Sequence, residues 1–387
     1  MLHHGQAKRA WLGLVAGLAC VTALAACSSS SSSSSSSTAG TSAAGGAGGS
    51  GSCSTVTNIK IGTTGSISDA GLMMANQLGY FKKYCISVSF QRINDSASQV
   101  TALATNQVQV LGFSNTAALF TSATQGIKMK VVGDKGGLSG TLGSYGVMVA
   151  KKYAGSSDSQ TLHNAIGKNF ALASTTDEET LLMDDYLKQY GLSLSDYHVV
   201  LIPFTSQAAA LENGSIQVAY SAEPWMSETV QSGAAVLLTH PGVGAAFGTN
   251  GPSLASLCYG PFMLNPQNKT IAQNFMDAYV LGVRYYDNAM FKNENTAQVE
   301  SVVAGNPFIG VPVAKYAAMH KAWLDPNQLA GGQSPANEQS FLQNLENYYV
   351  STGVMKKSQA VPASDVLDLS FATAAIAKFG TDQLSGS

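Results

Sequence analysis

The residues best suited to chemistry are short runs of hydroxyl, amide and carboxyl side chains, and each run follows an apolar stretch. Such groups, together with free backbone N–H groups at the start of a helix, bind small polar ligands without any covalent step. The runs therefore predict a binding site and no catalytic centre. They are Thr63, Thr64, Gly65 and Ser66; Asn94, Asp95 and Ser96; Ser114 and Asn115; Ser174, Thr175 and Thr176; and Glu223, Pro224 and Trp225.

Each run lies between a predicted strand and a predicted helix. In the first unit, Ile59 and Ile61 belong to a strand, and residues 70–80 form the helix that follows. In open α/β sheets such turns lie at the carboxyl ends of the strands, where ligands bind. A single Ser or Thr in such a turn is explained by helix capping, which contributes about 1 kcal/mol. The repetition of one turn chemistry at successive strand ends is better explained by a shared ligand cleft.

The order of apolar runs and helical patterns predicts an α/β fold with two lobes, each a parallel sheet covered by helices on both faces. Residues 53–144 form the first lobe and residues 145–252 the second, while residues 253–387 return to the first lobe and add C-terminal helices. The Gly-rich segment 134–144 and residues 253–261 are the predicted crossings between lobes, and they form the hinge. Lys135 is placed near this hinge as a further ligand contact. Predicted strands are residues 86–93, 107–112, 128–132, 145–150, 169–173, 198–203, 216–220 and 254–264; predicted helices include residues 69–84, 270–287, 295–303, 313–323, 337–352 and 363–377.

Composition and histidine spacing exclude several classes of protein. The net charge is −2 and only 11% of the residues are charged, so nothing is basic enough to bind nucleic acid. The histidines beyond the N-terminal segment have no metal-ligand spacing, and no Ser-His-Asp set can be inferred from them. We therefore expect no metal, no cofactor, no nucleic-acid partner and no enzymatic activity. These histidines are His163, His198, His240 and His320.

The N-terminus predicts export and lipid attachment. Lys8 and Arg9 precede an apolar run over residues 11–26, which is too short for a transmembrane helix of about 20 residues. The sequence Leu24-Ala25-Ala26-Cys27 resembles the lipobox of bacterial lipoproteins, whose Cys is lipidated. We expect a signal peptide over residues 1–26, lipidation at Cys27, a Ser/Gly-rich tether over residues 27–52, and a protein on the outer face of the cell membrane. The alternative is an ordinary signal peptide or short anchor in which the Cys is incidental.

Three cysteines remain after the predicted signal peptide. Cys53 lies just before the first strand and Cys85 just before the second. If these strands are parallel neighbours, both cysteines lie at one sheet edge, and outside the cytoplasm a disulfide between them is allowed. Two separate thiols are the alternative. Cys258 is expected to be a small buried apolar residue.

Several segments together resemble a known family of proteins. They are Gly62-Thr63-Thr64, Gly79-Tyr80-Phe81-Lys82-Lys83, the stretch from Asn94 to Ser98, the stretch from Leu103 to Val110, and the stretch from Ala219 to Trp225. Over residues 56–350 the chain is similar to the solute-binding proteins of ABC importers for nitrate, taurine, aliphatic sulfonates and thiamine-pyrimidine precursors (NMT1/THI5-like and SsuA-like). The resemblance implies a periplasmic-binding-protein-like fold of type II, a hinge, a clamped ligand, delivery to a permease with its ATPase, and a monomer. Departures from the family pattern at Asn106, Gln109 and Gln217 are expected to be structural.

The sequence leaves the ligand and the exact role open. Helix N-termini suit an oxyanion, but Asp95 and the pair Asp177 and Glu178 would repel one. A sulfonate, nitrate, taurine, or a small heterocycle or aromatic acid all fit, with Trp225, Phe113 or Tyr145 stacking on the ligand. Trp225 is equally explained as a core aromatic. The alternatives to an importer component are an extracytoplasmic ligand sensor on the same fold and a pyrimidine-synthesis enzyme.

Overall fold

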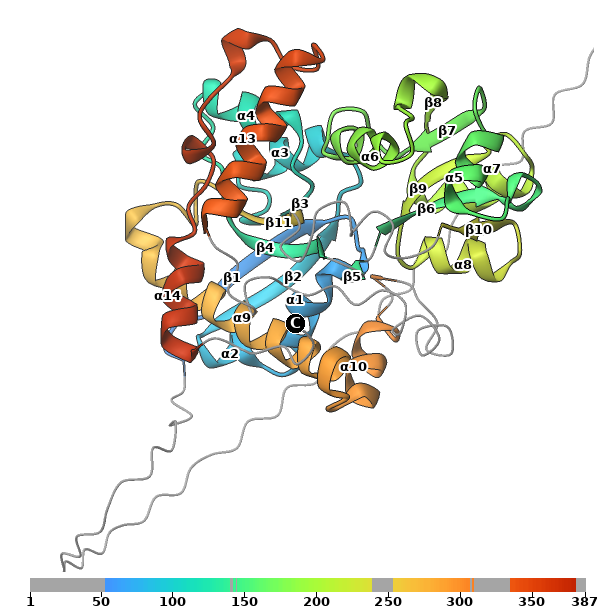
Figure 1. Cartoon of the computed structure of the whole chain (residues 1–387). Helices are drawn as coiled ribbons and strands as arrows, with labels where there is room; N and C mark the ends of the chain where they lie inside the picture. The colour runs from blue at the N-terminus through green and yellow to red at the C-terminus, as the bar shows by residue number, and fades with distance from the viewer. Residues whose placement is uncertain are drawn as a thin grey trace, which may run out of the picture. The chain divides into compact units, whose positions relative to one another are not determined.

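The structure contains two separate β-sheets, each covered by helices (Figure 1). This computed structural model describes residues 53–139, 142–143, 145–238, 253–306, 308–309 and 335–380. We call the six-stranded sheet with its helices lobe 1, and the five-stranded sheet with its helices, residues 145–237, lobe 2. The predicted α/β fold with two lobes is confirmed. The signal peptide, Cys27, the tether and the helix predicted over residues 313–323 lie outside the described residues.

Lobe 1 has a mixed sheet with the strand order β2-β1-β3-β11-β4-β5. Strand β1 pairs in parallel with β2 and β3, as predicted, whereas β11 runs antiparallel to both β3 and β4. The prediction of a wholly parallel sheet is therefore wrong at β11. The physical reason is that β11, on its return from lobe 2, starts beside the end of β4, where Ser253 pairs with Gly137, and it must therefore run along β4 in the opposite direction. The strands are β1 (Thr57–Thr63), β2 (Ile86–Arg92), β3 (Val110–Phe113), β4 (Lys130–Ser139), β5 (Leu142–Gly143) and β11 (Ser253–Tyr259).

Successive side chains of the lobe 1 strands point to opposite faces of the sheet, and helices cover both faces. On β3, Val110 packs with α1, α9 and α14, whereas Leu111 packs with α3, α4 and α13. The helix predicted over residues 69–84 is divided at Gly79, which has a φ of 72°. The elements are η1 (Ile67–Asp69), α1 (Ala70–Gln77), α2 (Tyr80–Lys83), α3 (Ser96–Ala104), α4 (Ala117–Thr124), η5 (Pro266–Asn268), α9 (Lys269–Lys292), α10 (Thr296–Val303), α13 (Pro335–Ser351), η6 (Lys357–Gln359), η7 (Ala363–Asp365) and α14 (Ser370–Phe379).

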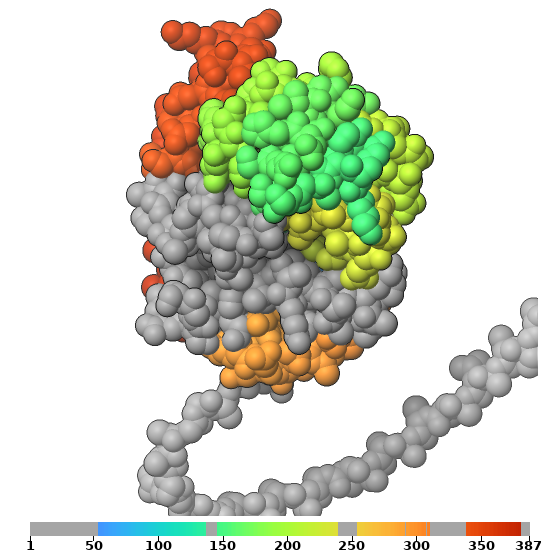
Figure 2. Space-filling view, turned by 45° about the vertical axis from the view of Figure 1, so that its right-hand side comes forward, coloured from blue at the N-terminus to red at the C-terminus, as the bar shows by residue number. Residues whose placement is uncertain are grey.

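Lobe 2 also has a mixed sheet, with the order β10-β6-β9-β7-β8. Strand β7 is parallel to β8 and β9, whereas β6 is antiparallel to β9 and β10. The chain enters from lobe 1 at the carboxyl edge of this sheet, where Tyr145 pairs with Ala222, so β6 must run in the opposite sense. In Figure 2 the green to yellow residues of lobe 2 gather into one continuous surface. The elements are β6 (Tyr145–Ala150), η2 (Lys151–Tyr153), α5 (Asp158–Asn164), β7 (Asn169–Leu172), α6 (Glu179–Lys188), η3 (Leu194–Asp196), β8 (His198–Leu201), α7 (Phe204–Glu212), β9 (Val218–Ala222), α8 (Trp225–Gln231) and β10 (Ala235–Leu237).

In each lobe, a Gln just before a central strand makes a similar pair of hydrogen bonds to the backbone. In lobe 1, Gln109 accepts a hydrogen bond from the Lys60 backbone N–H (2.8 Å) and donates to the Asn106 carbonyl (2.9 Å). In lobe 2, Gln217 accepts from the Asn169 N–H (3.1 Å) and donates to the carbonyl of the turn before it (2.6 Å). Asn106 has a φ of 60°, a conformation that Asn tolerates better than most residues. These departures from the family pattern are structural, as predicted.

The two predicted hinge segments are largely strand. Residues 134–139 belong to β4 and residues 253–259 to β11, and the two strands pair with each other. Their glycines were interpreted as flexible, but Gly136 and Gly137 lie in a ladder with register shifts opposite Ala255 and Ser253. Glycine is common at such irregular pairs, because a local kink needs a residue without a side chain. Residues 140–141 and 144, the rest of the first predicted crossing, lie outside the described residues.

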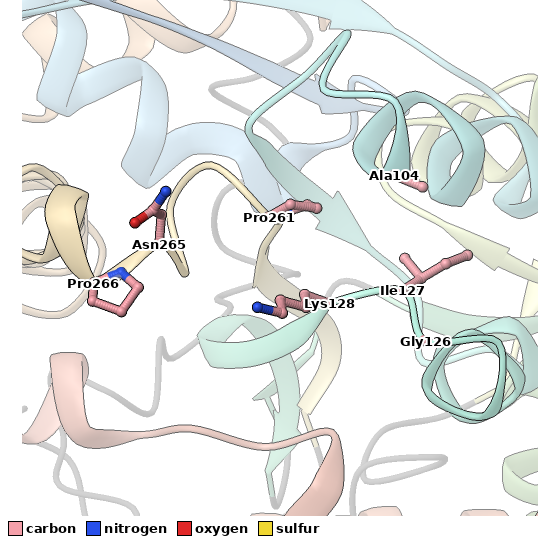
Figure 3. A pocket seen from close by; sticks show the side chains of 7 residues that line it. All are labelled: Ala104, Gly126, Ile127, Lys128, Pro261, Asn265 and Pro266. Atoms are coloured by element: carbon pink, nitrogen blue, oxygen red, sulfur yellow. The ribbon is translucent and has the colours of Figure 1, made fainter.

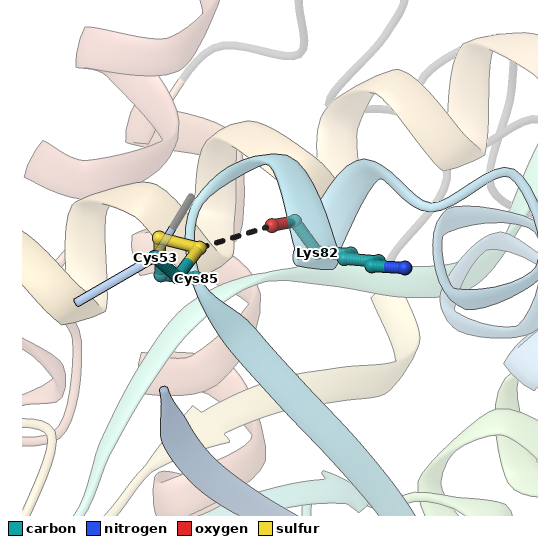
Figure 4. Close-up of a disulfide and its surroundings, with 3 residues drawn as sticks. All are labelled: Cys53, Lys82 and Cys85. Carbon is teal, nitrogen blue, oxygen red and sulfur yellow. Dashed lines mark hydrogen bonds between the residues drawn. A yellow bond between two sulfur atoms is a disulfide. The ribbon is translucent and has the colours of Figure 1, made fainter. Parts of the chain in front are cut away.

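A disulfide joins Cys53 to Cys85 in front of β1 and β2 (Figure 4). The parallel pairing of these strands brings the two residues to one sheet edge, with a Cα–Cα distance of 5.6 Å. Cys53 Sγ also lies 3.9 Å from the Lys82 carbonyl oxygen. This contact is not a hydrogen bond, because the sulfur of a disulfide carries no proton. Cys258 is buried as a free thiol, and burial raises its pKa.

Candidate functional site

The turn that follows β1 builds a buried polar network. Thr63 donates its hydroxyl hydrogen to the Asp69 carboxylate, with distances of 2.8 and 2.9 Å to the two oxygens. Lys135 Nζ, on β4, lies 2.8 Å from Asp69 Oδ1 and donates to Ser68 Oγ at 2.6 Å. Ser66 Oγ continues the network, 2.8 Å from Ser68 Oγ. All five residues are buried, so these polar groups satisfy one another.

Lys135 is therefore a buried structural cation, and its predicted place near a hinge and its ligand contact stay predictions. Its side chain is 2% exposed and runs across the sheet from β4 towards η1. Gly112 on β3 makes room for it, since a Cβ there would lie 2.7 Å from Lys135 Cε. The void beside it, about 10 Å³, is at the lower limit for a water molecule. The Lys135 ammonium group therefore forms a buried ion pair with Asp69.

Arg92 is the second cation near these turns, and its guanidinium also contacts other groups of the chain. Its guanidinium donates to the Thr64 carbonyl at 2.9 Å and to the Phe308 carbonyl, and it lies 5.0 Å from the centre of the Phe308 ring. Gly65 passes close to the same guanidinium with a φ of 81°, so any other residue there would be strained and crowded. The turn of Thr64 and Gly65 therefore packs against the Arg92 guanidinium.

The run after β2 is largely exposed. Asn94 and Asp95 are exposed, and Ser96 is partly buried at the start of α3. Asp95 accepts a hydrogen bond from the Ser98 backbone N–H at 2.8 Å. This bond, aided by the Ser98 side chain, lowers the pKa of Asp95. The geometry is that of an N-cap, and it accounts for Asp95 without a ligand.

The run after β3 connects lobe 1 to lobe 2. Asn115 is fully buried; its side-chain oxygen accepts from Ser256 Oγ (2.8 Å) and its carbonyl accepts from the Tyr349 hydroxyl (2.7 Å). Its backbone N–H donates to the Glu178 carboxylate of lobe 2. The backbone N–H of Ala117 donates to the Thr176 carbonyl at 2.8 Å. The predicted runs after β3 and β7 therefore meet, while Ser114 lies half-buried between them and the strand.

The run after β7 holds three consecutive buried carboxyl groups at the start of α6. The Ser174 side chain forms a hydrogen bond with the Asp177 carboxyl group. Glu179 Oε2 accepts a hydrogen bond from the Ala173 backbone N–H at 2.8 Å. Burial raises the pKa of Asp177 to about 6 and those of Glu178 and Glu179 well above the ordinary value, and the Asp177 charge raises the last two further. Thr175 is partly buried and Thr176 exposed beside them. From the sequence, Asp177 and Glu178 were expected only to repel an anion.

The run after β9 places a carboxyl group next to aromatic rings. Glu223 is fully buried and accepts from the Ser227 N–H (3.1 Å) and hydroxyl (2.6 Å). Burial raises its pKa to about 7. Pro224 is buried, and Trp225 is partly buried with its ring stacked on Phe204 at 5.8 Å between centroids. Phe204 was not among the predicted stacking residues.

Of the other two predicted stacking residues, Tyr145 lies at this edge and Phe113 lies in the core. Tyr145 is partly exposed; its ring stacks on Tyr220 (5.7 Å) and contacts Phe204 edge-on (6.4 Å). Phe113 is 1% exposed and packs in the core formed with α3, α4 and α13, so its predicted stacking role is wrong. The last residue of β3 points inward here because its neighbours, not the turn, determine its face.

A hollow lies at the opposite edge of the lobe 1 sheet. It has a volume of about 510 Å³ and is open to solvent (Figure 3). Lys128 precedes β4 and Pro261 follows β11, so the hollow borders the amino end of β4, away from the turns after β1 and β3. Ligands of α/β sheets bind at the carboxyl edge, and we therefore do not assign the site to this hollow. Its lining residues are Ala104, Gly126, Ile127, Lys128, Pro261, Asn265 and Pro266.

Comparison with known proteins settles the family. A family model described as NMT1/THI5 like matches residues 67–304, which is more than half of the chain. The chain belongs to the NMT1/THI5-like family. No curated protein sequence matches it. The predicted relationship is confirmed.

Solved structures show that this NMT1/THI5-like protein has a periplasmic-binding-protein-like fold. The ligand-binding component of an ABC-type import system from Staphylococcus aureus with zinc bound is 16% identical, with a TM-score of 0.64 over 82% of this chain and 99% of that one. The alkanesulfonate-binding protein SsuA from Xanthomonas axonopodis pv. citri bound to MOPS is 16% identical, with a TM-score of 0.62 and coverages of 82% and 99%. The periplasmic nitrate-binding protein NrtA from Synechocystis PCC 6803 is 12% identical, with a TM-score of 0.63 and coverages of 84% and 89%. These likenesses establish the fold.

Two searches of the described residues complete the comparison. No group of three or more His, Cys, Asp or Glu in the described part of the NMT1/THI5-like chain is arranged to hold a metal ion. Over the same residues, no helix has both the length and the apolar character needed to cross a bilayer.

Proposed function

We propose that this protein is an extracytoplasmic solute-binding lipoprotein. It captures a small molecule between its two lobes and delivers it to the permease and ATPase of an ABC importer. The observation that carries the proposal is the contact between the carboxyl edges of the two sheets, through Asn115 with Glu178 and Ala117 with Thr176. Strand-end edges that face each other form the usual place for a ligand in α/β proteins. Family membership and a fold shared with binding components of import systems support the same function.

The proposed ligand contacts come from turns in both lobes. Lobe 1 contributes the turns after β1 and β3, and lobe 2 contributes the turns after β7 and β9. The protein binds its ligand without chemical conversion. The two lobes close on the ligand, and the closed form is the one that the permease recognises. This is a shift of population driven by tighter binding to the closed form.

Membrane attachment is proposed to occur through lipid on Cys27. Residues 27–52 then act as a flexible tether, and the remainder is a monomer outside the cytoplasm. Growth with a labelled fatty acid tests this step: the wild-type chain should incorporate the label and the Cys27→Ala variant should not. Equal labelling of the two proteins would contradict lipid attachment at this residue.

A thermal-shift screen of the full-length protein in mild detergent tests ligand capture. The panel contains nitrate, taurine, alkyl and aryl sulfonates, aromatic carboxylates, hydroxymethylpyrimidine and organic amines. A ligand at a hundred times its Kd should stabilise the fold by about 2.7 kcal/mol. Hits confined to one chemical class, together with compaction in small-angle scattering, are the expected result. Copurification with a permease provides a separate test, and failure of both experiments would contradict the importer role.

A further inference from the structure

Lobe 2 gathers carboxyl groups without cations at its carboxyl edge. Asp177, Glu178, Glu179 and Glu223 are each at most 6% exposed. Their hydrogen bonds come from backbone N–H groups and from the hydroxyls of Ser174 and Ser227. Among the described residues, none of the four carboxylates contacts a Lys, Arg or His. Buried carboxylates without a cation are strongly unfavourable when ionised.

Glu178 has the most incomplete set of partners. Its Oε2 atom is buried and has no hydrogen-bond partner among the described residues. The charges that face it are those of Asp177, beside it in the chain, and Glu338 on α13. An additional acceptor oxygen, surrounded by other acids, is suited to a donor that carries positive charge.

A continuous row of aromatic rings leads to these acids. Trp225 stacks on Phe204 (5.8 Å), Phe204 contacts Tyr145 (6.4 Å), and Tyr145 stacks on Tyr220 (5.7 Å). Tyr220 lies close enough to the carboxyl groups at the start of α6 for their charges to raise its pKa. The first three rings are partly exposed. Partly exposed aromatic faces next to carboxylates are the environment that binds ammonium groups through cation–π contacts.

Of the two cations of the opposite lobe near these strand ends, Lys135 is buried and Arg92 is exposed. Lys135 is held by Asp69, and the Arg92 guanidinium is held by two carbonyls and the Phe308 ring. In the described part of the chain, no other Lys, Arg or His lies in the turns at these strand ends. An oxyanion beside the lobe 2 acids would therefore be repelled by them, and no Lys, Arg or His of lobe 2 lies in those turns among the described residues.

We propose that the ligand of this protein is an organic cation, an ammonium group carried on an apolar or aromatic body. The rings of Tyr145, Phe204 and Trp225 contact the apolar body of the ligand and make cation–π contacts with its ammonium group. The carboxyl groups of residues 177–179 and of Glu223 neutralise the charge as the lobes close. This inference rests on the proposed solute-binding function and names the class of solute.

Three probes of matched shape and different charge test the inference with the full-length protein. They are benzylamine as the cation, benzyl alcohol as the neutral molecule and benzylsulfonate as the anion, each added at millimolar concentration. Titration calorimetry and thermal shift should detect binding of benzylamine and little or no binding of the other two. Benzyltrimethylammonium, which cannot donate a hydrogen bond, separates the contribution of the rings from that of the carboxylates.

Variants locate the site. Glu178→Gln and Glu223→Gln should each weaken benzylamine binding by about tenfold or more, or 1.4 kcal/mol. Each substitution removes a buried carboxyl group that has no cation, so neither variant is expected to unfold. Weaker binding in these variants therefore cannot be attributed to a loss of stability. Trp225→Leu should weaken binding, and Trp225→Phe should restore most of it. Asp185→Asn, which removes an exposed carboxylate from the same helix α6, is the matched control and should change nothing.

The outcomes separate this inference from the proposed function. Preference for benzylsulfonate, or equal binding of all three probes, would overturn the cation class while leaving solute binding intact. Binding of benzylamine that is unchanged in Glu178→Gln and Glu223→Gln would overturn the site. Absence of any amine binding would also overturn the inference, and the permease copurification would then decide the importer role independently.

Discussion

Replacing Lys135 with Met should lower the free energy of unfolding by about 3–5 kcal/mol, because it leaves the Asp69 carboxylate buried without its cation. Lys135 Nζ and Asp69 Oδ1 are 2.8 Å apart, and their side chains are 2% and 0% exposed. At an effective dielectric constant near 20, two unit charges at this distance attract by about 6 kcal/mol. The hydrogen bond that the Thr63 hydroxyl donates to this carboxylate remains in the variant and limits the loss.

An exposed ion pair in the same chain provides the control. Lys188 and Asp185 on α6 are also 2.8 Å apart, but their side chains are 65% and 41% exposed. Such pairs contribute about 0–1 kcal/mol, so Lys188→Met should be nearly neutral. Equal distances with unequal burial isolate the effect of desolvation.

Urea unfolding followed by circular dichroism measures both variants, and a double-mutant cycle with Asp69→Asn completes the experiment. The coupling free energy should reach about 2–3 kcal/mol, because removing the second charge relieves the penalty left by the first. If Lys135→Met costs no more than Lys188→Met, or if the double variant is simply additive, the interpretation of Lys135 as a structural cation is wrong. The full-length protein is used throughout.

Three further predictions concern the disulfide, a buried acid and a helix cap. Cys53→Ser with Cys85→Ser should lower the unfolding free energy by about 3–4 kcal/mol, since the bond closes a loop of 32 residues; reductant should then have no further effect, and a stability unchanged by the substitutions would contradict the pairing. Glu223 has a pKa raised from 4.5 to about 7, so its protonated form favours the folded state and this stability is lost as pH rises from 4.5 to 7. Glu223→Gln should therefore remove about 3 kcal/mol of pH dependence over that range, whereas the exposed Glu212→Gln should leave the profile unchanged. Asp95→Ala should cost about 1 kcal/mol of stability and leave ligand affinity intact, and a large loss of affinity would show that Asp95 does more than cap α3.

The strand and helix pattern was predictable because it depends on local periodicity. The strand at Tyr145–Ala150 was predicted over the same residues, and the Asn and Gln departures from the family pattern have the structural roles expected of them. Strand direction was not predictable in the same way. Whether β11 is parallel or antiparallel depends on where the chain re-enters lobe 1, and that is a property of the whole topology.

The candidate site was only partly predictable for a related reason. Hydroxyl runs after strands were visible in the sequence, but which of them meet depends on the packing of one lobe against the other. Asp69 was interpreted as the first residue of a helix, and only the structure shows that it holds Lys135. The sequence signal was present, since a carboxyl group follows the hydroxyl turn directly and Lys135 lies in a Gly-rich part of its strand.

The acids of lobe 2 connect stability with binding. Asp177, Glu178 and Glu179 all have raised pKa values because of burial, so the folded protein takes up protons there and becomes less stable as they are lost at higher pH. Glu178 faces Asp177 and Glu338, and no described cation relieves the repulsion. A chain selected only for stability would do better with amides at these positions. A bound cation would remove the penalty on ionisation, so it should stabilise the protein more at pH 8 than at pH 5. The same groups that weaken the fold would then provide the free energy that draws the two lobes together around the ligand.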